Sequence, residues 1–155
     1  EAPDSDEIKS YIEYMLSIVP KENKLVVDTA RAYGLSEVRI GELIRTGKIS
    51  RDKYFLCTKW GENWKIKDFN YLSGLSKGNI DHSIQNLRHS VSLSLESLRS
   101  IDLLYIHHAT MEVMADKTVF SEMKKASRFI GVSISNREVL EEAIDSDLID
   151  IFDYT

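Results

Sequence analysis

The sequence predicts an α/β fold of about five parallel strands with intervening helices, arranged as part of a (β/α)8 TIM barrel. Short apolar runs alternate with longer amphipathic stretches along the 155 residues. Strands that are separated by helices pair in parallel through right-handed crossovers. An open, doubly wound sheet is the alternative, but a glycine-rich phosphate loop after the first strand is typical of that fold. No such loop follows the first apolar run, at 25–27, so the barrel is favoured.

Apolar periodicity assigns each element in order. Runs typical of buried strands lie at 24–28, 54–58, 101–106, 129–132 and 148–152. Stripes of apolar residues three or four positions apart predict helices at 4–19, 36–47, 81–98, around 119–126 and from 135 onward. A polar loop at 61–79 precedes the longest helix.

Polar side chains at the helix starts predict the caps. Asp4 or Ser5 is expected to cap the first helix and Ser36 the second, because short side-chain oxygens accept hydrogen bonds from the free N–H groups there. Ser135 and Glu138 have the spacing of a capping box at the start of the last helix.

Chain length sets the expected domain organisation. Five strands cannot close a barrel, which typically takes about 250 residues. The chain opens on Glu1 and stops at Thr155, inside a predicted strand. We therefore expect a single domain over residues 1–155 that is incomplete at both ends, with unpaired sheet edges through which the chain associates.

Charge and cysteine content exclude several classes of partner. A net charge of -5 argues against a nucleic-acid surface, which would be basic. No apolar run approaches the ~20 residues of a membrane span, and we find no signal peptide. The single cysteine, Cys57, excludes an internal disulfide and is expected to fill buried space. These features predict a cytoplasmic protein.

Chemically active side chains follow the predicted strands. The carboxyl ends of parallel strands lie on one rim, where α/β proteins bind their ligands. An acid, a phenol, an amine and an imidazole on successive strands indicate an active site rather than packing. In chain order the residues at this rim are Asp28, Tyr33, Lys59, His107, Ser133 and Asp153.

Four segments of the chain resemble successive signature segments of the aldo-keto reductase family. They read VVDTARAYGLSEVRIGELI, FLCTKWG, SLESLRSIDLLYIHH and RFIGVSIS. The resemblance implies a (β/α)8 barrel whose first strand and last third are missing here. It also implies an oxidoreductase that uses NADPH, or sometimes NADH, on small aldehydes, ketones or sugars. The catalytic tetrad of that family falls on Asp28, Tyr33, Lys59 and His107.

These four residue types suit carbonyl reduction. Hydride addition leaves negative charge on the carbonyl oxygen, which then needs a proton donor. A phenol with a pKa of about 10 is a weak acid at neutral pH. An ammonium ~4 Å away stabilises the phenolate by about 4 kcal/mol at an effective dielectric constant of about 20. We therefore expect Tyr33 to be the general acid, activated by Lys59, with Asp28 holding the lysine and His107 orienting the carbonyl.

The resemblance also implies contacts to the nicotinamide cofactor from Thr29, Ser133 and Asp153. The sequence departs from the family in two places. Ile134 follows the serine where family members often have Asn, and Asp153 stands where Gln is common. A carboxylate accepts a hydrogen bond from the carboxamide nitrogen but cannot donate one to its oxygen.

Two tryptophans follow the lysine of the tetrad. Trp60 and Trp64 lie where aromatic side chains often wall the substrate cleft in this family, and plain packing is the alternative for each. We expect Trp60, together with His107, to contact the substrate.

Two other functions compete with the reductase. One is a non-catalytic subunit of aldo-keto reductase type that senses the cofactor or scaffolds a partner. The other is a metal-dependent hydrolase that uses His107, His108 and Asp102. Neighbouring residues of a strand point to opposite faces, so His107 and His108 are not expected to share an ion. The sequence therefore predicts no metal site.

Overall fold

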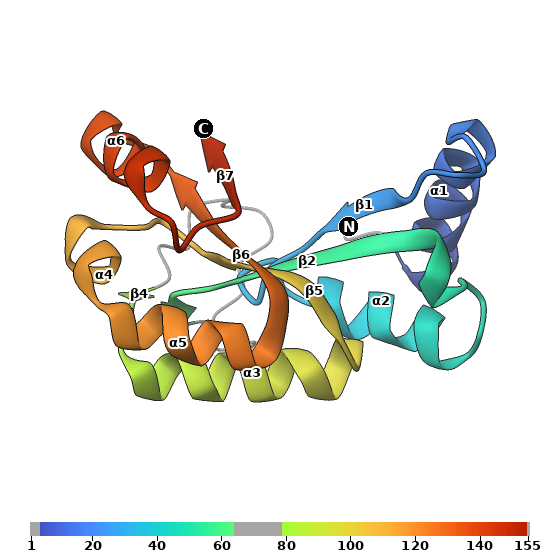
Figure 1. The fold of residues 1–155 in the computed structure, drawn as a ribbon. Helices are drawn as coiled ribbons and strands as arrows, with labels where there is room; N and C mark the ends of the chain where they lie inside the picture. The colour runs from blue at the N-terminus through green and yellow to red at the C-terminus, as the bar shows by residue number, and fades with distance from the viewer. Residues whose placement is uncertain (1–3, 64–78, 155) are drawn as a thin grey trace.

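The computed structural model describes residues 4–63 and 79–154. Its centre is a five-stranded parallel sheet in the order β1-β2-β5-β6-β7, formed by Leu25–Asp28, Tyr54–Trp60, Ile101–Ile106, Ser127–Ile134 and Ile151–Tyr154. The order in the sheet follows the order in the chain, so each crossover moves one strand along. The sheet curls into part of a barrel (Figure 1), which confirms the predicted fold.

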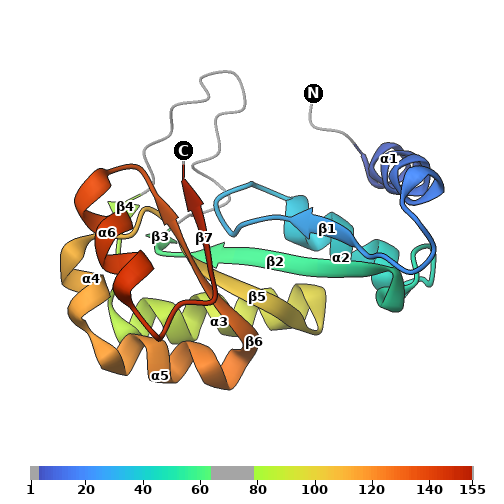
Figure 2. The ribbon, with the colours of Figure 1, turned by 45° about the horizontal axis from the view of Figure 1, so that its top comes forward.

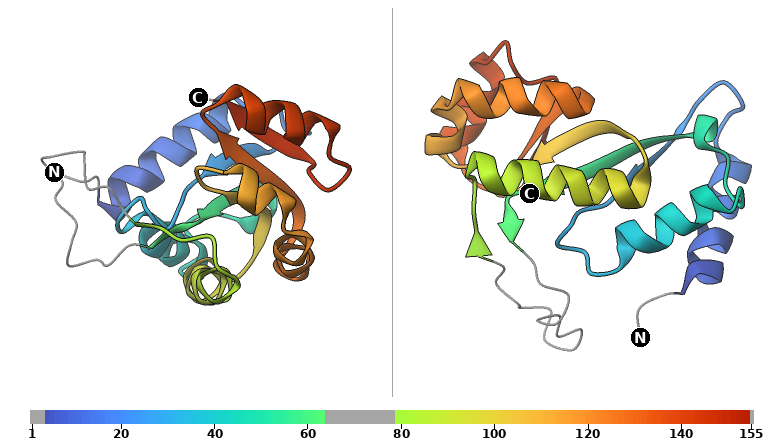
Figure 3. Two further views of the ribbon diagram at one scale, coloured as in Figure 1. Left: turned by 90° about the vertical axis from the view of Figure 1, so that its left-hand side faces the viewer. Right: turned by 90° about the horizontal axis from the view of Figure 1, so that it is seen from below.

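Helices cover the outer side of the curl. Figures 1 and 3 show α2 (Ser36–Arg45), α3 (Ile84–Leu98) and α5 (Lys117–Ala126) side by side beneath the sheet. The first and last helices, α1 (Ser5–Ile18) and α6 (Arg137–Asp145), lie toward its two ends. None of the helices in the described part of the chain has both the length and the apolar content that crossing a bilayer requires.

Four short elements complete the structure. A 3-10 turn, Arg51–Lys53, leads into β2, and α4, Met111–Ala115, precedes α5. The two ends of the predicted loop at 61–79 form strands instead, with β3 (Glu62–Asn63) antiparallel to β4 (Asn79–Ile80). Figure 2 shows this pair next to the carboxyl end of β2.

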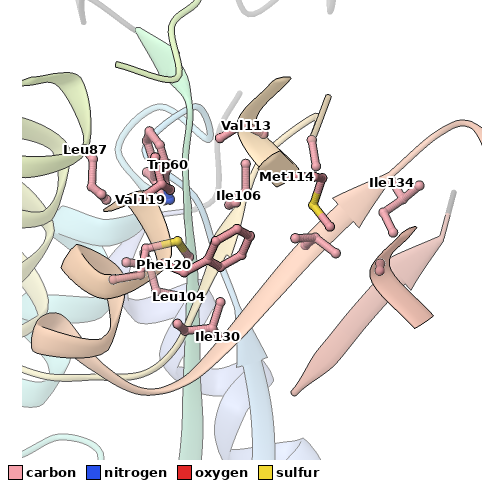
Figure 4. Close-up of a cluster of buried hydrophobic side chains, with 14 of the residues drawn as sticks. Trp60, Leu87, Leu104, Ile106, Val113, Met114, Val119, Phe120, Ile130 and Ile134 are labelled. Carbon is pink, nitrogen blue, oxygen red and sulfur yellow. The ribbon is translucent and has the colours of Figure 1, made fainter. Parts of the chain in front are cut away.

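The larger hydrophobic core lies between the sheet and helices α3 to α6. Alternate residues in the later part of both β5 and β6 contribute to it, because successive side chains of a strand point to opposite faces. They are Leu104, Ile106, Ile130, Val132 and Ile134. Burying one Leu, Ile or Phe side chain contributes about 1.5–3 kcal/mol to the stability of the fold. Figure 4 shows Leu87, Leu104, Ile106, Phe120 and Ile130 among its members.

A second core joins α1 and α2 to the strands β1 and β2. Its centre is formed by Ile12, Ile40, Leu43, Leu56 and Leu98. The two cores together hold the helices on the outer face of the sheet, so the opposite, concave face of the curl is left to other side chains.

Alternation along β2 determines which side chains reach that concave face. Leu56 and Trp60 pack in the two helix-side cores, whereas Cys57 lies with Tyr105 on the concave face. Lys59, two positions beyond Cys57, follows it there. The strand therefore brings one amine to the carboxyl rim of the sheet.

Two of the later strands begin or end at other residues than predicted. Strand β5 coincides with the predicted run at 101–106, while β6 is longer than 129–132 and β7 begins three residues later than predicted. The apolar residues Leu148 and Ile149 pack against the larger core instead. The Asp150 carboxylate accepts a hydrogen bond from the Ile130 N–H at 2.8 Å, which fixes the entry to β7.

Only the first predicted helix cap is confirmed. The carboxylate of Asp4 accepts hydrogen bonds at the start of α1. The Ser36 prediction is wrong, because its hydroxyl accepts a hydrogen bond from Thr29 at 2.9 Å and α2 has no side-chain cap. The Ser135 prediction is also wrong: α6 begins one residue later, with Asn136 as its cap.

Candidate active site

Lys59 is the centre of the site at the carboxyl rim. It is 3% exposed, and its ammonium forms an ion pair with the carboxylate of Asp28, the last residue of β1. Its Nζ also lies 3.5 Å from the carbonyl oxygen of Thr29. A charged group this deeply buried needs such partners, because removing an ammonium from water is otherwise costly.

Tyr33 lies beside this lysine on the loop that follows β1. Its N–H donates to the carbonyl of Ala30 at 3.0 Å, and its own carbonyl accepts from Ser36 at 3.1 Å, so a turn holds it at the entrance to α2. Lys59 Nζ is 5.0 Å from the centroid of the Tyr33 ring. Tyr33 is 45% exposed, so part of its side chain is open to solvent.

His107 completes the group predicted from the sequence. Its ring meets that of Tyr33 edge to face, with centroids 6.1 Å apart. Its N–H donates to the carbonyl of Trp60 at 2.7 Å, and its carbonyl oxygen is 2.9 Å from His82 Nε2. The structure thus brings together the four predicted catalytic side chains from three different strand ends.

Glu62 on β3 approaches the same histidine. Its Oε2 lies 3.1 Å from His107 Nδ1. The two groups are close but not aligned, and Nδ1 makes no hydrogen bond to any residue that the structure describes. Sequence reasoning missed Glu62, since it assigned the residue to a loop.

His108 overturns the expectation that the two histidines point apart. Strand β5 ends at Ile106, and His108 has a φ of +53°, in the left-handed region. The two imidazole rings therefore stack, with centroids 4.1 Å apart and planes 16° apart. Burial lowers the pKa of His108, and the neighbouring His107 adds to that shift. Strand alternation does not apply once the chain has turned out of the sheet.

The residues expected to bind the cofactor occupy different environments. Ser133 and Asp153 are directly paired on β6 and β7, and Ser133 is buried while Asp153 is partly exposed. Thr29 is fully buried, and its hydroxyl donates a hydrogen bond to Ser36.

Trp60 lies on the helix side of the sheet and not in the concave face. It is 1% exposed and packs in the larger core with Leu87 (Figure 4). This is the position of a packing residue and not of one that lines a substrate cleft. Trp64 lies outside the described residues. Asp102, the third member of the predicted hydrolase set, pairs with Arg51 and the N–H of Leu56, away from the two histidines.

A buried carboxylate behind the site was also missed by sequence reasoning. Glu37 on α2 is 1% exposed and accepts hydrogen bonds from Arg31 at 2.8 Å, Thr58 at 2.6 Å and Ser94 at 2.7 Å. It ties the loop that carries Tyr33 to β2 and α3. The sequence could have indicated that Glu37 is buried, since it lies three residues before the buried Ile40 on the same face of the helix.

Comparison with known proteins gives a consistent picture. The family model described as aldo/keto reductase family matches residues 9–154. No curated protein sequence matched the chain.

Solved structures of similar fold include three aldo-keto reductases. One from Bacillus halodurans, in its holo form, superimposes with a TM-score of 0.75 at 22% identity, over 98% of this chain and 49% of its own. One from Brucella melitensis gives 0.58 at 25% identity, over 93% and 50%. One from the silkworm Bombyx mori, solved with NADPH, gives 0.61 at 20% identity, over 99% and 45%. The chain therefore spans about half the length of these structures.

Proposed function

Because the chain belongs to the aldo/keto reductase family, we propose that it carries the catalytic residues of a nicotinamide-dependent oxidoreductase. The proposed reaction transfers a hydride between the cofactor and a small aldehyde, ketone, sugar or corresponding alcohol, in the cytoplasm. The observation that carries the proposal is the position of Lys59, which contacts the carboxylate of Asp28 and the ring of Tyr33 at once.

Tyr33 is the proposed general acid. In the direction of reduction, a proton from its hydroxyl goes to the carbonyl oxygen as negative charge develops there, and the tyrosine is left as phenolate. The ammonium of Lys59 stabilises that phenolate electrostatically. Asp28 acts through the lysine, because its carboxylate holds Nζ at the rim. This explains why an acid, an amine and a phenol occur together.

His107 is the proposed orienting residue for the carbonyl group. Its ring lies against the ring of Tyr33, so an oxygen within reach of the phenol is also near the imidazole. A hydrogen bond from the histidine would fix the direction of the carbonyl and stabilise charge on its oxygen. Hydrogen bonds to the backbone of His107 hold that ring in place.

The residues at the ends of β6 and β7 fit a nicotinamide cofactor. A hydroxyl can donate to the oxygen of a carboxamide and a carboxylate can accept from its nitrogen. Ser133 and Asp153 lie side by side in register and offer these two groups. When bound, the reduced nicotinamide supplies the hydride. The silkworm reductase solved with NADPH supports NADPH over NADH as the cofactor of this chain.

Replacing Tyr33 by Phe tests the proposal. Loss of a general acid costs about 100- to 10,000-fold in rate, so we expect a decrease of that size in kcat for the full-length protein with NADPH and a panel of aldehydes. Tyr14, which is 63% exposed on α1, provides the control, and Tyr14→Phe should retain the parental rate.

Two results would contradict the proposal. Equal rates for Tyr33→Phe and its parent would remove Tyr33 as the acid. Quenching of NADPH fluorescence without turnover of any substrate would instead favour the non-catalytic, cofactor-sensing subunit. Thermal unfolding of both variants shows whether either change acts through stability.

A further inference from the structure

A cluster of metal-ligating side chains adjoins the proposed active site. Glu62 on β3 and the two histidines after β5, His107 and His108, present ligand atoms that all lie within 4.8 Å of one another. We propose that these three side chains bind a divalent transition-metal ion, with Zn²⁺ as the best match to two imidazoles and one carboxylate. The proposed site does not depend on reductase activity.

The unpartnered nitrogen of His107 is the first argument for the site. This residue is 8% exposed, and Nδ1 makes no hydrogen bond to a described residue. Buried polar atoms are usually paired. Glu62 Oε2 lies 3.1 Å from Nδ1, and two ligands about 2.0–2.1 Å from a tetrahedral zinc are about 3.3 Å apart. An ion bound between them would give the buried Nδ1 of His107 a partner.

The rigidity of the backbone around the histidines is the second argument. The His107 N–H donates to Trp60 at 2.7 Å, its carbonyl lies 2.9 Å from His82 Nε2, and the Ala109 N–H donates to Ser133 at 3.0 Å. These contacts hold the segment from both sides. A ligand set on a fixed backbone loses little conformational entropy when an ion binds.

The position of His108 supplies the third ligand. Its positive φ turns the side chain toward His107 instead of away from it. Stacked rings cannot both direct an in-plane lone pair at one ion, so binding requires one ring to rotate. His108 is exposed and can make that rotation. Metal binding should therefore unstack the two imidazoles.

The donor set also predicts which ions bind. Imidazole nitrogens suit Zn²⁺ and Co²⁺, whereas Mg²⁺ prefers oxygen ligands and keeps its water. Three protein ligands leave a fourth position for water, as in zinc sites that are not purely structural.

The test is a titration of the full-length protein, freed of metal by a chelator, with Co²⁺ and then Zn²⁺. We expect visible absorption from bound Co²⁺ that Zn²⁺ abolishes and Mg²⁺ does not. His108→Ala and Glu62→Gln should each weaken Zn²⁺ binding at least about tenfold, since even indirect changes around a metal cost 10- to 100-fold. His89, exposed on α3, is the control, and His89→Ala should bind as the parent does.

Nuclear magnetic resonance of the histidine rings gives a readout on the parent protein itself. Zn²⁺ should shift the ring signals of His107 and His108 and leave those of His89 unchanged. Absence of Co²⁺ absorption in the parent, or equal Zn²⁺ affinity in His108→Ala, would overturn the site. Turnover is measured separately, so a reductase that binds no metal refutes only the metal site, and a metal-binding protein without turnover refutes only the reductase.

Discussion

At the scale of single residues, burial acts on each ionisable group according to the partners that surround it. Lys59 is buried next to the carboxylate of Asp28, with which it forms an ion pair. Cys57, two positions earlier on the same face, is different: burial raises the pKa of its thiol to about 12, and the nearby Asp28 adds to the shift. Burial likewise raises the pKa of Tyr54 and of Tyr105 to about 12. These groups stabilise the fold only while they are protonated.

Stability should therefore fall between about pH 9 and pH 12. The unfolded chain releases the Cys57 proton near pH 9.0, whereas the folded chain keeps it to about pH 12. The contribution is complete below the unfolded pKa and is lost as the pH rises toward the folded one. Urea unfolding at pH 8 and pH 11 measures the loss. Iodoacetamide should label Cys57 slowly in the native protein, and native labelling as fast as in urea would contradict the buried, protonated thiol.

The buried carboxylate of Glu37 leads to a second prediction at this scale. Removing one partner of a buried, hydrogen-bonded ion pair typically costs about 3–5 kcal/mol, so Glu37→Ala should lower the free energy of unfolding by about that amount. Arg31, Thr58 and Ser94 would lose their shared acceptor. Glu96, exposed on α3, is the control, and its change to Ala should stay within about 0.5 kcal/mol of the parent. Similar losses for both variants would show that the network is not stabilising.

The sequence could predict which residues meet at the carboxyl rim, but it could not predict every contact that their side chains make there. Parallel strands bring their carboxyl ends to one edge, so Lys59, Tyr33 and His107 could be expected to meet. The stacking of His108 depends on a single positive φ, which no periodicity indicates. The burial of Trp60 follows from alternation along β2 and could have been predicted from the strand.

At the scale of elements, the helix pair α2 and α3 packs closely because one residue has no side chain. A Cβ atom on Gly41 would lie 2.0 Å from the backbone carbonyl oxygen of Ser97. Backbone cannot rotate out of the way as a side chain can. The glycine therefore sets the distance between the helices that hold Glu37 and Ser94 behind the site.

Gly41→Ala should destabilise the protein by about 1–3 kcal/mol, the typical cost of overpacking, even though Ala is the better helix former by about 1 kcal/mol. Chemical denaturation gives the free energy. Gly47→Ala provides the comparison, since its Cβ would meet nothing within 4 Å and only its φ of +71° opposes the change. A stabilised Gly41→Ala variant would show that the two helices separate without cost.

Apolar periodicity predicted which helices and strands exist better than it predicted the residues at which they begin and end. The predicted strand at 101–106 is observed as it stands, because five of its six residues are buried, on the two faces of the sheet. The pairing of β3 with β4 involves two residues on each side, too few for any alternation to be recognised. Helix starts depended on which of several neighbouring polar residues was already engaged elsewhere, as Ser36 was with Thr29.

At the scale of the whole molecule, the curled sheet has two edge strands, β1 and β7. Both carry exposed apolar side chains, with Val26 63% exposed on one and Phe152 48% and Tyr154 56% on the other. Apolar edge strands favour pairing with another chain or segment. The sequence predicted these edges from the number of strands alone.

Residues 1–155 expressed alone should therefore associate, and Phe152→Lys should reduce the association, since charge on an edge strand opposes pairing. Sedimentation velocity over a range of concentrations measures it. Ile144→Lys, at a residue 59% exposed on α6, is the matched control and should associate as the parent does. A monomer at every concentration would contradict the expected role of the edges.

The agreement between strand order and chain order has a consequence for biosynthesis. Each strand of the sheet pairs with the sheet strand that precedes it in the chain and is therefore synthesised before it. The nascent polypeptide can thus build this curl progressively, without waiting for distant partners, and N-terminal parts of proteins generally fold first during translation. Asp28, Tyr33, Lys59 and His107 would already be assembled when β7 is still to be synthesised.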